Sequence, residues 1–370
     1  MKIGILTHYQ AESHGACLQH YALTQYLRQL GHEVYTLTYV RDFTFSPERQ
    51  QKKFSVNFHS IPFYIKEYLL KLGPAYVWTM ARKHFRLRKF SRTHFQFLPY
   101  NTCGLDAVIV GSDEVWSLQT GVDAMMFGHG VNAGKLIAYA PSFGQTTQLE
   151  IQDRGCQALL QAGLSSFDRL SARDSHTQQL TATLIGQHPA LVCDPALLYD
   201  FDAELTAHRH RVKTPYVVVY AYSSDLNEPD RVDAILSYAR SIGAKVYAVG
   251  SFHPWCHRQI TCDPLELLGW FIGASAVFTD TFHGTIAAFV CRRPMAVWVR
   301  PSNCKKLEHL LSVLGLKARR VTGQHPLRDV MAEPIDFDTL HSALQALRAD
   351  SAAWLEQALE FSCPKEGNTQ

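Results

Sequence analysis

The sequence lacks the features that mark several large classes of protein. No apolar run approaches the roughly 20 residues that a transmembrane helix needs. The nine cysteines are an odd number without a CxxC pair, which excludes the disulfide framework of a small secreted protein. Lys2 leads straight into a short apolar run, Ile3 to Leu6, so we expect no signal peptide. The net charge of +3, from 36 basic and 33 acidic residues, is too small for a dedicated nucleic-acid binder. We therefore expect a cytoplasmic protein that binds no nucleic acid.

Common catalytic and cofactor motifs are also missing. The chain contains no GxGxxG, no Walker lysine, no GxSxG and no HExxH, and no cysteine lies in a recognisable nucleophile context. One segment, FHPWCHRQITC, is rich in metal-ligating side chains, but its spacing fits no standard zinc site; the side chains are His253, Cys256, His257 and Cys262. We expect neither a metal nor a bound cofactor.

The residues that are present predict two α/β domains. Apolar residues make up 46% of the 370, which is enough for substantial cores, and this length favours two domains. The chain opens with an apolar strand at Ile3 to Leu6, a helix with Leu18, Tyr21 and Tyr26 on one face, and a second strand at 34–40. Such a βαβ unit implies a parallel sheet with right-handed crossovers. The predicted fold class is α/β, with two Rossmann-like doubly wound domains facing a cleft.

Composition shifts along the chain suggest the domain boundaries. The polar, basic stretch Ala207 to Thr214 separates two series of alternating strands and helices. Among these elements we expect strands at 106–110 and 276–278 and one helix at about 149–164. We therefore place an N-terminal domain at 1–206, a C-terminal domain at 214–336, and a C-terminal helix with a tail at 337–370.

Residues 41–100 interrupt the rhythm of the first domain, and we expect a helical insertion with a basic face there. Two helical stripes are expected, one of Ile65, Leu69 and Leu72 and one of Val77, Ala81 and Phe85. Basic side chains crowd the second part of the segment: Arg82, Lys83, Arg86, Arg88, Lys89 and Arg92. The plain explanation is a solvated helix surface. The alternative is a landing site for an anionic substrate or a membrane surface.

Ligands in parallel-sheet domains bind beyond the carboxyl ends of the strands, so the loops after strands are the candidate site. Gly15 opens the first helix and would let the backbone approach a ligand closely. The loop GSDEVW offers Ser112 and Asp113 to sugar hydroxyls and Trp116 as a stacking wall, and YAPSFG offers Ser142. Ordinary helix capping is the alternative explanation for these serines and the aspartate.

Two further loops carry charge. Arg173 ends the strand of LSARDS, and its guanidinium matches a carboxylate or phosphate bidentately, although a surface ion pair with Asp174 would also explain it. In TDTFHGTIAAF, Asp280 and His283 follow a strand, and Gly284 opens the next helix. An imidazole there can exchange protons, a carboxylate can orient it, and the helix N-terminus can bind an anion. The alternative is a capping aspartate with a buried histidine.

The loops together resemble one family, the polysaccharide pyruvyl transferases. The resemblance covers about residues 3–316 and rests on motifs in a shared order: HGACLQHYALTQYLRQLGHEV, VIVGSDEVW, IAYAPSFG, LSARD, VCDPALLY, TDTFHGTIAAFVCRRPMAVW and KLEHLLSVLGL. It implies a GT-B-like pair of domains and transfer of pyruvate from phosphoenolpyruvate to sugar hydroxyls as a ketal, with phosphate released. The pathway implied is exopolysaccharide or cell-surface glycan synthesis.

The resemblance also implies roles for individual residues. His283 and Asp280 match the catalytic pair, with Asp280 orienting the histidine. Arg173 matches the family's mid-chain arginine and would bind the donor with Gly284, Thr285, Lys305 and Lys306. The acceptor would contact the loops of the first domain, through Gly15, Ser112, Asp113, Trp116 and Ser142.

Two departures from the family pattern bear on substrates. Ser13 and His14 stand before Gly15 where the family carries asparagine and tyrosine, and Asn303, Lys305 and Lys306 stand where many members carry arginine. Two other functions therefore remain open: a GT-B glycosyltransferase that uses a nucleotide sugar, and a non-catalytic saccharide-binding or assembly protein. For the transferase, the acceptor can be free, nucleotide-linked or lipid-linked, and we expect peripheral contact with the inner face of the membrane.

Overall fold

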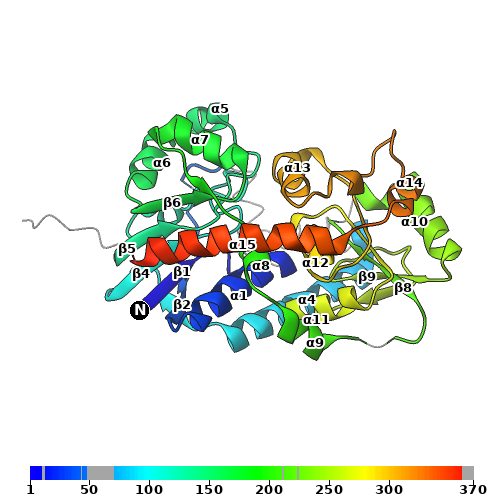
Figure 1. Ribbon diagram of the computed structural model, residues 1–370. Helices are drawn as coiled ribbons and strands as arrows, with labels where there is room; N and C mark the ends of the chain where they lie inside the picture. Colours follow the sequence, from blue (N-terminus) through cyan, green and yellow to red (C-terminus); the bar gives the residue numbers. More distant parts are fainter. Residues whose placement is uncertain (11–12, 43, 48–70, 211, 223–224, 361–370) are drawn as a thin grey trace, which may run out of the picture.

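The first domain is built on a parallel seven-stranded sheet. The computed structural model in Figure 1 describes residues 1–10, 13–42, 44–47, 71–210, 212–222 and 225–360. The strand order is β3-β2-β1-β4-β5-β6-β7, and each pair of neighbouring strands is parallel. The strands are β1 (Lys2–Leu6), β2 (Glu33–Thr38), β3 (Phe97–Pro99), β4 (Leu105–Val110), β5 (Ala133–Ala138), β6 (Arg169–Ala172) and β7 (Ala190–Leu191).

The second domain repeats this plan with five parallel strands in the order β10-β9-β8-β11-β12. These are β8 (Tyr216–Tyr220), β9 (Lys245–Val249), β10 (Arg258–Ile260), β11 (Ala276–Thr279) and β12 (Met295–Val297). Central strands such as β8 are buried along their whole length, as parallel strands covered on both faces should be. The predicted fold class of two Rossmann-like α/β domains is confirmed. The change of sheet falls between Leu191 and Tyr216.

Helices cover both sheets. In the first domain they are α1 (His14–Gln29), α4 (Lys71–His94), α5 (Gln148–Asp153), α6 (Gln157–Leu164), α7 (Ser175–Ile185), α8 (Pro195–Leu198) and α9 (Asp202–His208). In the second they are α10 (Pro229–Ser241), α11 (Pro264–Ile272), α12 (Phe282–Val290), α13 (Cys304–Val313) and α14 (Leu327–Ala332). The single helix expected near 149–164 is two helices, because Gly155 adopts a positive φ of 67° between them.

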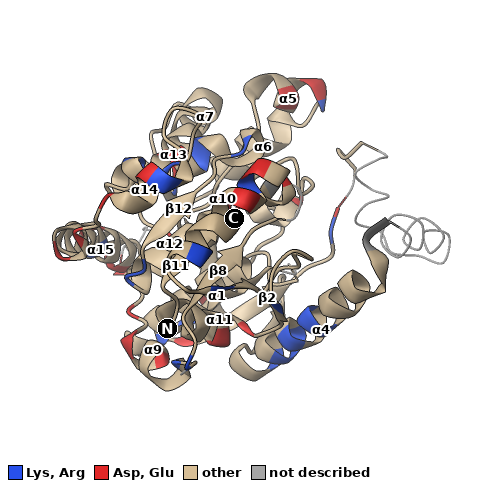
Figure 2. Ribbon diagram, turned by 90° about the vertical axis from the view of Figure 1, so that its right-hand side faces the viewer, with Lys and Arg blue, Asp and Glu red and all other residues tan. Residues whose placement is uncertain are grey.

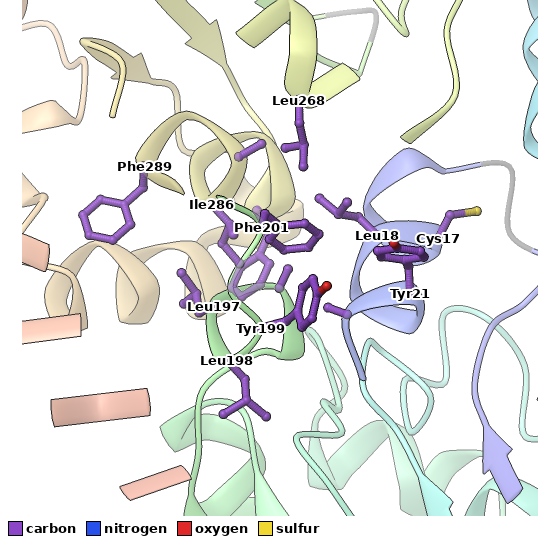
Figure 3. Packing of buried hydrophobic residues seen from close by; sticks show 14 of the residues in the cluster. Cys17, Leu18, Tyr21, Leu197, Leu198, Tyr199, Phe201, Leu268, Ile286 and Phe289 are labelled. Atoms are coloured by element: carbon purple, nitrogen blue, oxygen red, sulfur yellow. The ribbon is translucent and has the colours of Figure 1, made fainter. Parts of the chain in front are cut away.

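The two domains share one apolar core at their junction. Figure 3 shows Leu18 and Tyr21 of α1 facing Leu268 of α11 and Ile286 of α12, with Phe201 between them. Burial of a large apolar side chain stabilises a fold by about 1.5–3 kcal/mol. This cluster therefore fixes α1, whose first turn carries Gly15, against α12, whose first turn carries His283.

The basic insertion contains α4, and its residues 48–70, including the expected helical positions Ile65 and Leu69, lie outside the described part of the chain. The predicted stripe of Val77, Ala81 and Phe85 does not face the core, since Phe85 is 69% exposed. Leu87 and Phe90 are the buried side chains of α4. Figure 2 shows its lysines and arginines along the helix.

A last helix, α15 (Phe337–Glu360), lies across both domains (Figure 1). The Ser351 hydroxyl accepts a hydrogen bond from the Cys193 N–H at 3.0 Å, and Asp338 pairs with Arg292 of the second domain. Among the described residues, none of the helices combines the length and apolar character required to cross a bilayer.

Candidate active site

Charged side chains from both domains meet beyond the carboxyl ends of the strands. In the first sheet, Asp113 follows β4, Arg173 follows β6 and Asp194 follows β7. In the second, His283 lies just after β11 and Arg300 after β12. This is the edge where doubly wound sheets bind ligands.

Arg173 and Asp194 form the buried centre of the cluster. Nη1 of Arg173 donates to Oδ2 of Asp194 at 2.8 Å, and their side chains are 2% and 0% exposed. Asp113 lies farther away, with its Oδ1 3.7 Å from the same Nη1. Burial alone would lower the pKa of Arg173, but the charges of Asp194 and Asp113 raise it, so the guanidinium stays charged.

Arg173 keeps donor capacity for another anion. Its Nε and Nη2 find no hydrogen-bond partner among the described residues, although both atoms are buried. Cζ of the guanidinium lies 4.4 Å from the centroid of the Phe282 ring, which covers it. Buried N–H groups without hydrogen-bond partners destabilise the folded protein, unless a bound ligand accepts hydrogen bonds from them.

His283 also faces Asp194. Its Nε2 lies 3.4 Å from Oδ2 of Asp194. Oδ1 of Asp194 accepts the Ala196 N–H at 2.9 Å and so caps α8, which fixes the carboxylate in place. Burial would raise the pKa of Asp194, but His283 and Arg173 hold it well below its ordinary value. One ionised carboxylate therefore orients both the arginine and the histidine.

Asp280 has a different partner from the one expected. Its Oδ1 accepts the Tyr222 N–H at 2.9 Å, and its Oδ2 lies 3.1 Å from Nε of Arg300. The carboxylate against His283 is Asp194, so the proposed orientation of His283 by Asp280 is replaced by an Asp194–His283 pair. Asp280 instead fixes Arg300, whose guanidinium also lies over the ring of Tyr222 at 5.5 Å.

Gly15 allows the two domains to close on His283. A Cβ atom on residue 15 would lie 2.4 Å from Nδ1 of His283 and 2.5 Å from its Cβ. Two neighbours of Gly15 also reach the second domain. His14 has its Nε2 2.9 Å from the carbonyl oxygen of Cys262, and the Ser13 hydroxyl lies 3.2 Å from that of Tyr222.

Asp113 and Lys306 complete the polar surface. Asp113 has a φ of 81°, a left-handed conformation that costs energy in residues other than glycine and that clusters at functional sites. Burial would raise the pKa of Asp113, but His283 and Arg173 lower it. Lys306 pairs with Glu114 at 2.7 Å, and its Nζ lies 5.8 Å from the Phe282 ring.

Three predicted acceptor contacts are wrong in their geometry. Trp116 is 0% exposed, donates from Nε1 to the Met126 carbonyl at 2.8 Å, and belongs to the core rather than to a sugar-stacking wall. Ser142 is buried and donates to Asp174 at 2.6 Å. Ser112 is buried as well, and its hydroxyl donates to the Ala140 carbonyl at 2.9 Å.

Three predicted donor contacts are also engaged elsewhere. The Gly284 N–H donates to the Thr281 hydroxyl at 2.9 Å, and the Thr285 hydroxyl donates to the Thr281 carbonyl at 2.9 Å, so both belong to the buried cap of α12. Lys305 has its Nζ 3.2 Å from Nε2 of His176. Of the predicted residues, the structure groups Gly15, Asp113, Arg173, His283 and Lys306 in the charged cluster.

Sequence reasoning missed Asp194, Phe282, Tyr222 and Arg300. Asp194 and Arg300 each follow a strand, as Arg173 does, so the same rule applied to VCDP and VWVRP would have found both. Tyr222 and Phe282 carry no polar pattern of their own, and only their contacts with Arg300 and Arg173 identify them.

Comparison with known proteins gives a family match and distant structural likenesses. The model of a protein family described as polysaccharide pyruvyl transferase matches residues 14–302. No curated protein matches the chain. Among solved structures, the chain is similar to the Staphylococcus aureus MnaA–UDP co-structure, with 12% identity, coverage of 97% and 96% of the two chains, and a TM-score of 0.48. It is also similar to the Escherichia coli heptosyltransferase WaaC with ADP, with 13% identity, coverage of 94% and 100%, and a TM-score of 0.41.

Proposed function

This chain belongs to the polysaccharide pyruvyl transferase family, and we propose that it transfers a pyruvyl group from phosphoenolpyruvate to two hydroxyls of a saccharide. The product is a ketal, and inorganic phosphate is released. The observation that carries the proposal is the pair of contacts that Asp194 makes, with Arg173 at 2.8 Å and with His283 at 3.4 Å. Through these contacts, Asp194 holds an anion-binding group, Arg173, next to a proton-transfer group, His283.

The donor carries a carboxylate and a phosphate, and the cluster offers a cation for each. Arg173 presents Nε and Nη2, which have no partner among the described residues, as a bidentate fork, and the Phe282 ring lies over the guanidinium. Lys306 and Arg300, with side chains 16% and 19% exposed, are the cations that reach solvent and suit the phosphate. On donor binding, Lys306 would then leave its ion pair with Glu114 and pair with the phosphate of the donor.

The proton transfers fall to His283. Since its Nε2 faces ionised Asp194, the proton on that nitrogen is fixed, and Nδ1 beside Gly15 exchanges protons with substrate. His283 donates a proton to C3 of phosphoenolpyruvate while the first hydroxyl attacks C2, and it then accepts the proton of that hydroxyl. The second hydroxyl displaces phosphate from C2, and its proton leaves with the phosphate.

Asp113 suits the acceptor side. Its carboxylate is ionised, 17% exposed and next to Arg173, so it can accept hydrogen bonds from the hydroxyls that attack. The acceptor is a saccharide of an exopolysaccharide or cell-surface glycan. Phosphoenolpyruvate is the co-substrate, and the proposed reaction uses no cofactor.

The test is phosphate release from phosphoenolpyruvate in the presence of saccharide acceptors. General acid–base catalysis contributes about 10²- to 10⁴-fold, so His283→Ala should slow turnover by at least that factor. His188→Ala, at an exposed position, is the matched control and should leave the rate unchanged. Near-normal turnover by His283→Ala would overturn the role of the histidine.

A second measurement separates this function from glycosyl transfer. A ligand at about 100 times its Kd adds roughly 2.7 kcal/mol to the free energy of unfolding, which raises the melting temperature. Phosphoenolpyruvate should stabilise the protein, and Arg173→Ala should lose this effect. Stabilisation by nucleotide sugars alone, with release of the nucleoside diphosphate, would replace the proposal by a glycosyltransferase.

A further inference from the structure

A second pocket lies beside the basic helix α4, at the β3 edge of the seven-stranded sheet. Its volume is about 480 Å³, and its walls come from the loop after β1, the start of α1, the end of β2, β3 and α4. None of the side chains that contact the donor or exchange protons in the mechanism above lines it. It is large enough for a sugar ring with a phosphate group.

The pocket combines cations with aromatic rings. Arg88 and Arg92 of α4 line it, and neither forms a hydrogen bond or ion pair with any residue that the structure describes. Tyr9 and Phe97 also line it, with ring centroids 5.5 Å apart and planes tilted by 55°. No acidic side chain is among the described residues of its lining.

The spacing of the two arginines favours a bound anion. Residues four apart on a helix are neighbours, with Cβ atoms about 6 Å apart, and like charges there repel each other. A phosphate between them would relieve this repulsion and accept charge-assisted hydrogen bonds from both. Arg86, on the same helix but outside the pocket, already pairs with Glu266 of the second domain.

Two segments of the chain carry residues of both the pocket and the charged cluster. Tyr9 follows His8, whose Nε2 lies 3.2 Å from the carbonyl oxygen of Glu114, the residue that pairs with Lys306. Cys17 lines the pocket from α1, in the same first turns of the helix as Gly15, which contacts His283. Because Gly15 and Cys17 are two residues apart on α1, a saccharide of a few rings held in the pocket can extend toward His283.

We infer that this pocket binds the phosphate-bearing end of the acceptor, a sugar phosphate whose ring lies against Tyr9 and Phe97 and whose phosphate lies between Arg88 and Arg92. The hydroxyls that receive the pyruvyl group then extend toward His283. The role as an acceptor site rests on the proposed function, whereas the binding of a phosphorylated sugar does not. A lipid diphosphate and a nucleoside diphosphate share this chemistry.

Calorimetric titration of the full chain tests the inference with three probes: N-acetylglucosamine, its farnesyl diphosphate derivative and its uridine diphosphate derivative. Arg88→Gln/Arg92→Gln should weaken binding of a phosphorylated probe by about 10- to 100-fold. Arg82→Gln/Lys89→Gln removes the same charge from exposed positions of α4 that do not line the pocket, and should bind the probe as the unmodified protein does. Tighter binding of the farnesyl or the uridine derivative identifies a lipid or a nucleotide carrier.

Three results would overturn the inference. They are failure of both phosphorylated probes to bind, equal binding of the sugar without phosphate, and equal loss of affinity in the two double variants. A parallel titration with phosphoenolpyruvate should give the same affinity in all three proteins, and its loss in Arg88→Gln/Arg92→Gln would assign these arginines to the donor instead. If phosphoenolpyruvate does not bind the unmodified protein, the proposed function fails while the sugar-phosphate titrations still decide the pocket.

Discussion

The backbone of Gly15 lies against the imidazole of His283, so closely that a Cβ atom at residue 15 would come within 2.4 Å of Nδ1. The two residues belong to the first turns of α1 and α12, in different domains. The glycine therefore serves the approach of the domains rather than a turn, because it leaves the space that the histidine ring occupies.

Gly15→Ala should displace His283 and slow pyruvyl transfer by at least about 10²-fold, the minimum expected for general acid–base catalysis. The Ala side chain clashes with the ring and with its Cβ, so a rotamer change alone cannot relieve it. Steady-state rates of phosphate release measure the effect. Gly323→Ala is the matched control, since nothing lies within 4 Å of a Cβ atom there. A fully active Gly15→Ala would show that the domains separate during the reaction.

Asp194→Asn should impair both stability and catalysis. Removing one charge of a buried pair costs about 3–5 kcal/mol, and it leaves Arg173 with the more distant Asp113, at 3.7 Å, as its ion-pair partner. The amide also no longer orients His283 as an anion. Urea unfolding and the pH–rate profile measure the two effects. Asp153→Asn, at an exposed position, should change neither. An unaltered pH–rate profile in Asp194→Asn would separate this carboxylate from the proton transfer.

Stability should fall as the pH drops below 6.5. Burial lowers the pKa of both His14 and His20 from 6.5 to about 3. Above pH 6.5 these histidines are neutral in both states; below it the unfolded chain binds protons that the folded protein does not, so stability is lost down to about pH 3. At pH 5 each should cost about 2 kcal/mol.

Thermal unfolding between pH 8 and pH 5 checks this linkage. His20→Gln removes one of the two groups and should make the fall in melting temperature shallower, whatever its effect on stability at pH 8. The exposed control His188→Gln should retain the full slope. Equal slopes in all three proteins would mean that His20 is protonated in the folded state.

The outer surface of α4 should bind anionic membranes. Trp78 and Phe85 are 66% and 69% exposed, and the exposed basic residues Arg82 and Lys89 lie on the same helix. We propose peripheral contact with the inner face of the membrane, where each basic residue contributes about 1 kcal/mol. Arg82→Gln/Lys89→Gln should weaken sedimentation with phosphatidylserine vesicles by about 30-fold, and Lys245→Gln/Lys317→Gln should not. Absence of vesicle binding by the unmodified protein would refute the contact.

Much of the fold could be predicted from the sequence because buried parallel strands are short apolar runs with polar residues after them. The run at 276–278 became β11, and the run near 106–110 became β4 within a residue of its expected start. The same rule located Arg173 and His283, since their position after a strand is a local property that the sequence displays.

Other features depend on how deeply a side chain is buried and on which distant residues it contacts. Local sequence patterns do not encode either property. Trp116 stands in a loop that looks accessible, yet its indole fills the core beside Phe143 at a centroid distance of 5.4 Å. Asp194 looks like an ordinary helix cap before Pro195, and only the packing of α8 against α12 turns its second oxygen toward His283. Asp280 is nearer to His283 in sequence, but its carboxylate pairs with Arg300.

The helix α15 has a mechanical consequence. The chain passes from one sheet to the other between Leu191 and Tyr216, and α15 ties the two domains together a second time through Ser351 and Asp338. Rotation of one domain against the other must therefore keep both connections intact or release one end of α15, and it must also shift the apolar core that the two domains share.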